Sequence, residues 1–182
     1  MTVLVRKVEP AAWKATADGI HVTEVAADFV FTKNTSREIA TERCTLSFWR
    51  FDPTTRGWED EAALAIAGGW KTINDGLYIV VLEENIVRDA GIALRESAGE
   101  TRVDDLRDHH VDAEALDIGR LNVMAKIIAD TIRNAGRVVA RSRGDLLTLL
   151  ANAAEARRLQ LAQLPKDLQA QVSGHLNSRK QS

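Results

Sequence analysis

A group of basic residues within positions 118–143 is the first candidate for chemistry in this chain. The stretch carries six Lys or Arg residues and a single Asp. If it is helical, Lys126, Arg133 and Arg137 share one face, and Arg141 joins them if the helix continues that far. A basic stripe of this kind could follow the phosphates of a nucleic acid. These four residues are therefore the candidate nucleic-acid-binding site.

The alternative is that the same face is solvated or contacts an acidic protein surface. Asp130 lies four residues after Lys126 and three before Arg133, so it can pair with either and weaken the positive field. No aromatic residue lies in or near this stretch of the sequence, so base stacking is not expected there. We therefore favour the solvated or protein-contacting face over contact with nucleic acid.

A second candidate is an acidic segment, residues 101–117, that contains two adjacent histidines. His109 and His110 lie among several aspartates, and imidazoles beside carboxylates can bind a divalent metal ion. The segment is polar and weakly patterned, which indicates an exposed connection with no metal site. Cys44 is the only cysteine, so the sequence excludes an intramolecular disulfide and a cysteine-based zinc centre. No cofactor is expected.

The aromatic residues form a third candidate, because all nine of them lie in the first 78 residues. Trp49, Trp58 and Trp70 could line a pocket or an interface, where tryptophan is favoured. Packing of these rings against helices is the preferred interpretation. The sequence contains no Walker A loop, no dinucleotide-binding glycine motif, no HExxH and no GxSxG. A small enzyme with a Trp-lined site on a sheet is therefore the third functional hypothesis.

The elements that must position these residues differ between the two parts of the chain. The aromatic part is rich in Val, Ile and Thr and predicts strands, whereas the later part predicts helices. The expected strands are residues 2–8, 42–51, 77–82 and 92–95, together with residues 19–32 as one bent strand or two short ones. In the strand over 42–51, Cys44, Leu46 and Phe48 face one side and Trp49 and Phe51 the other. The run 77–82 is apolar throughout, which indicates a strand buried on both faces.

Short helices are expected over residues 59–67 and 83–90, and three longer ones after residue 112. The first of these runs to about residue 135, the second covers 146–164, and the third begins at Pro165 and ends near Leu176 before a frayed tail. Residues 138–140 either continue the first of them or form a short strand. The predicted fold class is α+β: a mostly antiparallel mixed sheet of four to five strands with short helices, followed by a C-terminal helical region. The division is 1–111 for the acidic sheet domain and 112–182 for the basic helical region.

Charge and helix patterning together suggest a partner. Residues 1–117 carry 13 basic and 22 acidic side chains, and residues 118–182 carry 11 and 4. Opposite charges could meet within one chain or between two. One face of the helix predicted over 146–164 carries Leu146, Leu150, Ala153 and Leu161, the candidate interface of a two-fold homodimer.

The leading functional hypothesis is a non-enzymatic protein–protein interaction module or assembly subunit that acts through its C-terminal helices. A nucleic-acid-associated regulator is the alternative. The longest apolar runs are far too short to span a bilayer, and no secretory signal is recognised, so a cytoplasmic protein without a membrane partner is expected.

Overall fold

A computed structural model describes residues 1–8, 45–133 and 137–181 of the chain. The strand predicted over residues 19–32 and the position of Cys44 lie outside the described residues. Within them, six strands form one sheet: β1 (Val3–Val8), β2 (Leu46–Phe51), β3 (Leu77–Glu83), β4 (Ala93–Glu96), β5 (His110–Glu114) and β6 (Val138–Arg141). Their order is β4-β5-β2-β1-β3-β6, and every described pairing is antiparallel. The predicted α+β class is confirmed.

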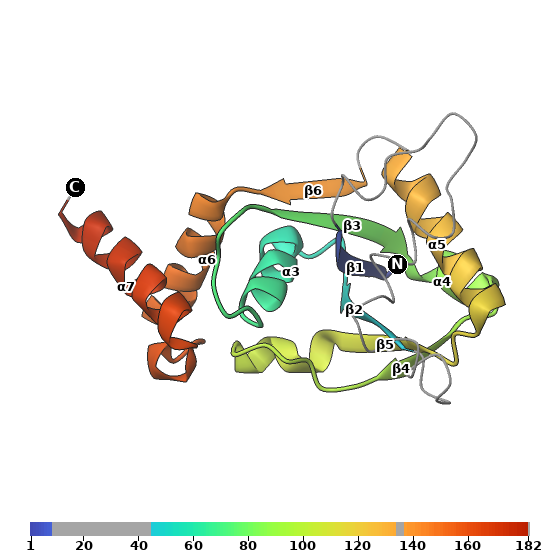
Figure 1. Cartoon of the computed structure of the whole chain (residues 1–182), viewed down its shortest axis with the longest axis horizontal. Helices are drawn as coiled ribbons and strands as arrows, with labels where there is room; N and C mark the ends of the chain where they lie inside the picture. The colour runs from blue at the N-terminus through green and yellow to red at the C-terminus, as the bar shows by residue number, and fades with distance from the viewer. Residues whose placement is uncertain (9–44, 134–136, 182) are drawn as a thin grey trace.

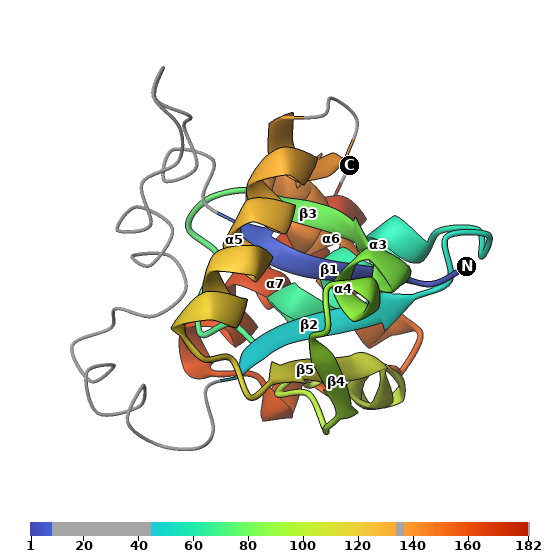
Figure 2. The ribbon, with the colours of Figure 1, turned by 90° about the vertical axis from the view of Figure 1, so that its right-hand side faces the viewer.

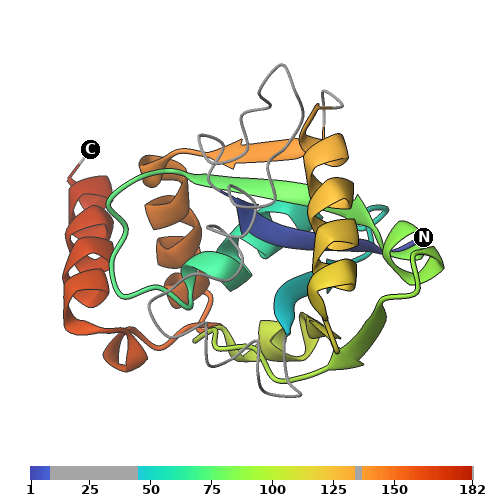
Figure 3. The same cartoon turned by 45° about the vertical axis from the view of Figure 1, so that its right-hand side comes forward.

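Helices cover both faces of this sheet (Figures 1 and 2). The α-helices are α3 (Trp58–Ala67), α4 (Glu84–Asp89), α5 (Ile118–Arg133), α6 (Arg143–Glu155) and α7 (Lys166–Lys180). Two short 3-10 helices are η1 (Asp104–His109) and η2 (Leu161–Gln163). α5 and α4 cover one face, whereas α3, α6 and α7 lie on the other side, with α7 outermost against α6 (Figures 2 and 3). Among the described helices, none is long and apolar enough to cross a membrane.

Side-chain alternation divides the apolar residues into two core clusters, one on each face. In β2, Leu46 and Phe48 belong to the cluster under α5, while Phe51 belongs to the cluster under α3 and α6. The predicted alternation of this strand is therefore confirmed over the residues described. β3 contributes to both clusters and has a neighbouring strand on each side, as its unbroken apolar run predicted.

Two strands lie where the sequence did not clearly predict them. β5 lies inside the segment interpreted as an exposed connection, and it pairs with β2 and β4. Its inward residues, Val111 and Ala113, are buried, although their neighbours are polar. β6 resolves the open alternative for residues 138–140 in favour of a strand. β5 crosses the proposed boundary at residues 111/112, and the parts on either side of it share one sheet.

The helix predicted over 146–164 ends nine residues early. Arg157 adopts a left-handed backbone conformation with φ of 60°. The N–H of Arg157 bonds the carbonyl of Ala154, and the N–H of Arg158 bonds that of Ala153. This is the Schellman termination that glycine usually provides. Because arginine stands at the glycine position, the sequence carried no stop signal there.

The last helix is longer than expected, since α7 continues to Lys180 through the tail that the sequence analysis expected to be frayed. A contact near its end helps to hold it: the Arg179 guanidinium donates to the Asn152 side chain at 2.8 Å. The prediction that the helix ends near Leu176 was therefore wrong.

The candidate interface residues lie in the chain's own core. Leu146 and Leu150 are 0% exposed and Ala153 is 4% exposed. Leu161 is partly buried against the same cluster. Leu146, Leu150 and Ala153 are therefore not available to a second copy of the chain without opening the fold.

We expect Leu150→Ala to destabilise the folded chain by about 2–5 kcal/mol, because it leaves a cavity in a closed core. The measurement is urea denaturation, with size-exclusion elution as the check on assembly. Val123→Ala on α5, where Val123 is 42% exposed, should change stability by less than about 0.5 kcal/mol. A Leu150→Ala variant as stable as wild type, with a lower assembly mass, would contradict this placement.

A buried carboxylate joins three elements on the opposite side of the sheet. Glu84, at the start of α4, forms ion pairs with Arg50 of β2 at 3.0 Å and Arg88 at 2.6 Å. Burial opposes its charge, but hydrogen bonds from Arg88 and Thr2 and the charge of Arg50 outweigh burial and lower the pKa of Glu84. Arg50 also reaches Glu96 of β4 at 3.1 Å.

The lowered pKa of Glu84 makes the free energy of unfolding depend on pH in the acid range. The ionised group stabilises the fold above its ordinary pKa of 4.5, and this contribution is lost as the pH falls through the lower folded value. Glu84→Gln should therefore destabilise the chain at pH 7 by about 1.5–3 kcal/mol. Denaturation at a series of pH values should show a smaller difference between variant and wild type in acid. A difference that is constant with pH would be evidence against this role.

Candidate functional site

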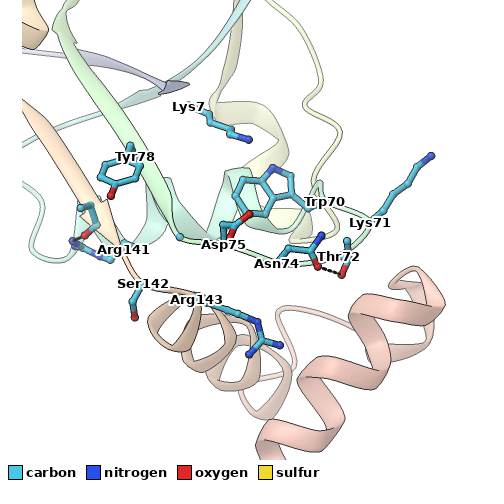
Figure 4. A pocket seen from close by; sticks show the side chains of 12 residues that line it. Lys7, Trp70, Lys71, Thr72, Asn74, Asp75, Tyr78, Arg141, Ser142 and Arg143 are labelled. Carbon is cyan, nitrogen blue, oxygen red and sulfur yellow. Dashed lines mark hydrogen bonds between the residues drawn. The ribbon is translucent and has the colours of Figure 1, made fainter. Parts of the chain in front are cut away.

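A pocket with a volume of about 870 Å³ lies where the loop after α3 meets the ends of β3 and β6 (Figure 4). Two aromatic rings and four basic side chains stand in its wall, against one acidic side chain. The lining residues are Lys7, Trp70, Lys71, Thr72, Asn74, Asp75, Gly76, Tyr78, Ala140, Arg141, Ser142 and Arg143. We call this the cationic pocket.

Strand pairing brings the distant parts of this lining together. Leu77 of β3 lies opposite Arg141 of β6, and Tyr78 lies opposite Ala140. The loop before β3 packs tightly on β6, because a Cβ atom on Gly76 would lie 2.8 Å from the carbonyl oxygen of Arg141. Only glycine permits this approach without displacing the backbone.

Arg141 is fixed by two carboxylates of α3. Its guanidinium lies 3.1 Å from Glu59 and 2.9 Å from Asp60. Burial opposes the charge of Arg141, but the hydrogen bonds to Asp60 and Glu59 outweigh burial and raise its pKa above the ordinary value of arginine. Arg141 therefore stays charged, and its charge is largely neutralised by α3.

Two other basic side chains of the cationic pocket, Lys71 and Arg143, are less compensated than Arg141. The Lys7 ammonium lies over the Trp70 ring, 5.0 Å from its centroid. Lys71 is exposed, and Arg143 donates from Nε to the carbonyl of Ile73 at 3.0 Å. Within residues 1–8, 45–133 and 137–181, no carboxylate pairs with Lys71 or Arg143. Their charges therefore face the solvent in the pocket.

One side chain of α7 holds the loop that carries Trp70 and Lys71. Ile73, which is fully buried, donates its backbone N–H to Gln171 Oε1 at 2.9 Å. Gln171 Nε2 in turn donates to the carbonyl of Ile73 at 3.1 Å. The side-chain amide thus satisfies both backbone groups of a residue far away in sequence, which fixes the pocket loop to the outermost helix.

Replacing Gln171 by Leu should loosen this loop, because a buried N–H and C=O both lose a partner. We expect the free energy of opening at the Ile73 amide to fall by about 1–3 kcal/mol. Native-state hydrogen exchange measures it. Gln163→Leu, at an exposed position of η2, is the matched control and should leave Ile73 protection unchanged. Equal protection in wild type and Gln171→Leu would disprove the role of the clamp.

The four residues of the predicted basic stripe do not lie together on one helix. α5 ends at Arg133, which pairs with Asp130 at 3.4 Å. Arg137 lies beyond α5 and pairs with Glu83, and Arg141 lies on β6. Lys126 is exposed on α5. Of the four, only Arg141 lines the cationic pocket.

The expectation that no aromatic ring lies near the basic residues holds for the sequence but not for the fold. Tyr78 and Trp70 line the same pocket as Arg141, because β3 pairs with β6. Trp49, Trp58 and Trp70 all pack against the core cluster, as preferred for the tryptophans. Of the three, Trp70 also lines this pocket.

His110 belongs to a polar cluster on β5 rather than to an exposed connection. Its Nδ1 lies 2.8 Å from Ser97 Oγ, and the single proton of that hydroxyl is donated to Asp112 at 2.7 Å. In a nucleophilic triad the imidazole lies between the hydroxyl and the carboxylate, whereas here the hydroxyl lies between the other two. The arrangement is therefore a hydrogen-bonded brace between β4 and β5 and does not activate Ser97.

His109 packs in a different way, with its ring stacked on Phe51 at 4.9 Å between centroids and its Nδ1 2.9 Å from the carbonyl oxygen of Arg50. Over the described residues, no group of three or more His, Cys, Asp or Glu side chains is arranged to hold a metal ion. The two histidines thus stand in separate environments.

No protein-family model, curated protein or solved structure matches this chain.

Proposed function

We propose that the protein is a non-enzymatic binding module whose cationic pocket recognises a polyanionic partner. One observation carries the proposal: four basic side chains and one acidic side chain line a single pocket of about 870 Å³. A concave site lined by one sign of charge concentrates ligands of the opposite sign. Its volume lies within the range of about 300–1,000 Å³ typical of ligand pockets.

The net attraction comes from two of the four basic residues. Arg141 is balanced by the carboxylates of α3, so it supports the wall of the pocket. Lys71 and Arg143 then act against Asp75. Because Asp75 is the one acidic side chain among the described residues that line the pocket, an anion entering it meets a positive field.

The hypothesis of an interaction module is retained, but its surface is moved from the C-terminal helices to this pocket. The apolar residues proposed for a helical interface pack inside the chain, which leaves a charged pocket as the better-supported contact site. The catalytic alternative has less support, because the Ser97–His110–Asp112 cluster lacks the order of a nucleophilic site.

Inorganic polyphosphate is a suitable first probe, because it offers charge without aromatic rings. We expect binding at low salt, with a log–log salt slope of about −1.4 if Lys71 and Arg143 each contact a phosphate. The double variant Lys71→Gln/Arg143→Gln removes both contacts, so it should bind much more weakly and its slope should approach zero. Isothermal titration calorimetry at several salt concentrations measures both.

The matched control is the double variant Lys126→Gln/Arg133→Gln, which removes the same charge from α5. It should bind polyphosphate as wild type does, and circular dichroism should show that both double variants are folded. The proposal is overturned if wild type shows no binding at low salt, or if the α5 variant loses binding while the pocket variant keeps it.

A further inference from the structure

We infer that the partner of the cationic pocket is a single-stranded nucleic acid, whose bases stack on Tyr78 and Trp70 while its phosphates contact the basic residues. The inference rests on the proposed function, and it adds the chemical class of the ligand. Stacking rings beside positive charges are the combination by which proteins hold single strands without reading a fixed sequence.

Tyr78 provides an exposed ring on a strand that is otherwise largely buried. It is 44% exposed, whereas Leu77 and Ile79 on either side are at most 1% exposed. Its cross-strand neighbours are Val8 and Ala140, neither of which is an aromatic partner. Figure 4 shows its ring projecting from β3 beside Arg141. An aromatic ring left partly in water at a charged pocket can take up a planar ligand.

Trp70 provides a second ring on a separate element, the loop that follows α3. Lys7 reaches toward it from β1, and its ammonium lies 5.0 Å from the ring centroid (Figure 4). The next residue of the same loop, Lys71, is exposed in the pocket and places a phosphate-binding charge next to this stacking surface. Base and phosphate are neighbours in every nucleotide, so the arrangement fits a nucleotide unit.

Two other polyanions fit the pocket less well. A duplex keeps its bases stacked inside the helix, where neither ring can reach them without base flipping. An acidic protein surface would pair with the basic residues, but its carboxylates supply no planar group that stacks on the two aromatic rings. A strand with unpaired bases uses both features, because its bases can reach the rings of Trp70 and Tyr78 while its phosphates meet the basic residues of the same pocket.

The test compares ligands that carry the same phosphates with and without bases. The probes are a short fluorescent oligothymidylate, an abasic strand of equal length, the matching duplex and free thymidine monophosphate as competitor. Fluorescence anisotropy at low salt should show the oligothymidylate bound at least about fivefold more tightly than the abasic strand. The duplex should bind more weakly than the oligothymidylate, and the mononucleotide should compete poorly.

Tyr78→Ala should remove much of the preference for bases and leave abasic binding unchanged. Tyr78→Phe keeps the ring and should keep the preference. Ile86→Ala is the matched control, because Ile86 on α4 is also 44% exposed and lies outside the pocket lining. Trp70→Leu should act as Tyr78→Ala does, and the Tyr78 pair decides the matter if the Trp70 variant fails to fold.

The outcomes separate the two proposals. Equal affinity for the oligothymidylate and the abasic strand would overturn the nucleic-acid inference and leave the polyanion proposal standing. Duplex binding as tight as single-strand binding, or competition by the mononucleotide at equal concentration, would also overturn it. Loss of abasic and oligothymidylate binding to the same degree in Tyr78→Ala would show that the ring supports the fold and not the ligand. Failure of wild type to bind polyphosphate and abasic strand would instead overturn the proposed function.

Discussion

The rest of the structure depends on the pairing of β1 with β3, because both strands carry apolar side chains on both faces. Six residue pairs join them, and the side chains of Leu4 and Val5 point to opposite faces although both are fully buried. Such a pair cannot be stable with one face in water, since each buried aliphatic side chain contributes roughly 1.5–3 kcal/mol. Helices must therefore cover both faces of the sheet, and the C-terminal helices cover part of one face.

The cationic pocket lies where this cover ends. Along β1 and β3 the burial pattern is broken at Lys7 and Tyr78, two of the residues that line the pocket. Beyond α3 the chain forms the loop held by Gln171, and the start of α6 closes the opposite side. The pocket is thus framed by elements that the core holds together, and the Trp70 ring packs against that core.

The sequence predicted the elements with a clear apolar pattern and missed those set by tertiary contact. β2 was predictable from its alternating apolar residues and β3 from its unbroken apolar run. β5 was not predictable, because its polar residues form side-chain hydrogen bonds that only the fold reveals. The end of α6 was not predictable either, because an arginine takes the left-handed position where glycine is usual. The pocket was the least predictable feature. Its lining comes from three separate stretches, and only the register of β3 against β6 brings Tyr78 and Arg141 together.

The opposite charges of the two parts of the chain are largely paired with each other within the chain. Basic side chains of the later part pair with acidic ones of the earlier part in three places: Arg137 with Glu83, Arg141 with Glu59 and Asp60, and Arg158 with Glu61 and Asp105. The hydrogen bonds to Glu61 and Asp105 raise the pKa of Arg158 above its ordinary value, so these ion pairs persist at any physiological pH.

Intrachain pairing therefore accounts for much of the opposite charge that had suggested a second chain. The positive charge that matters for binding is local: Lys71 comes from the acidic part of the chain and Arg143 from the basic part. They line the same pocket because the fold brings them there, and net charge by segment would have assigned only one of them to a binding surface.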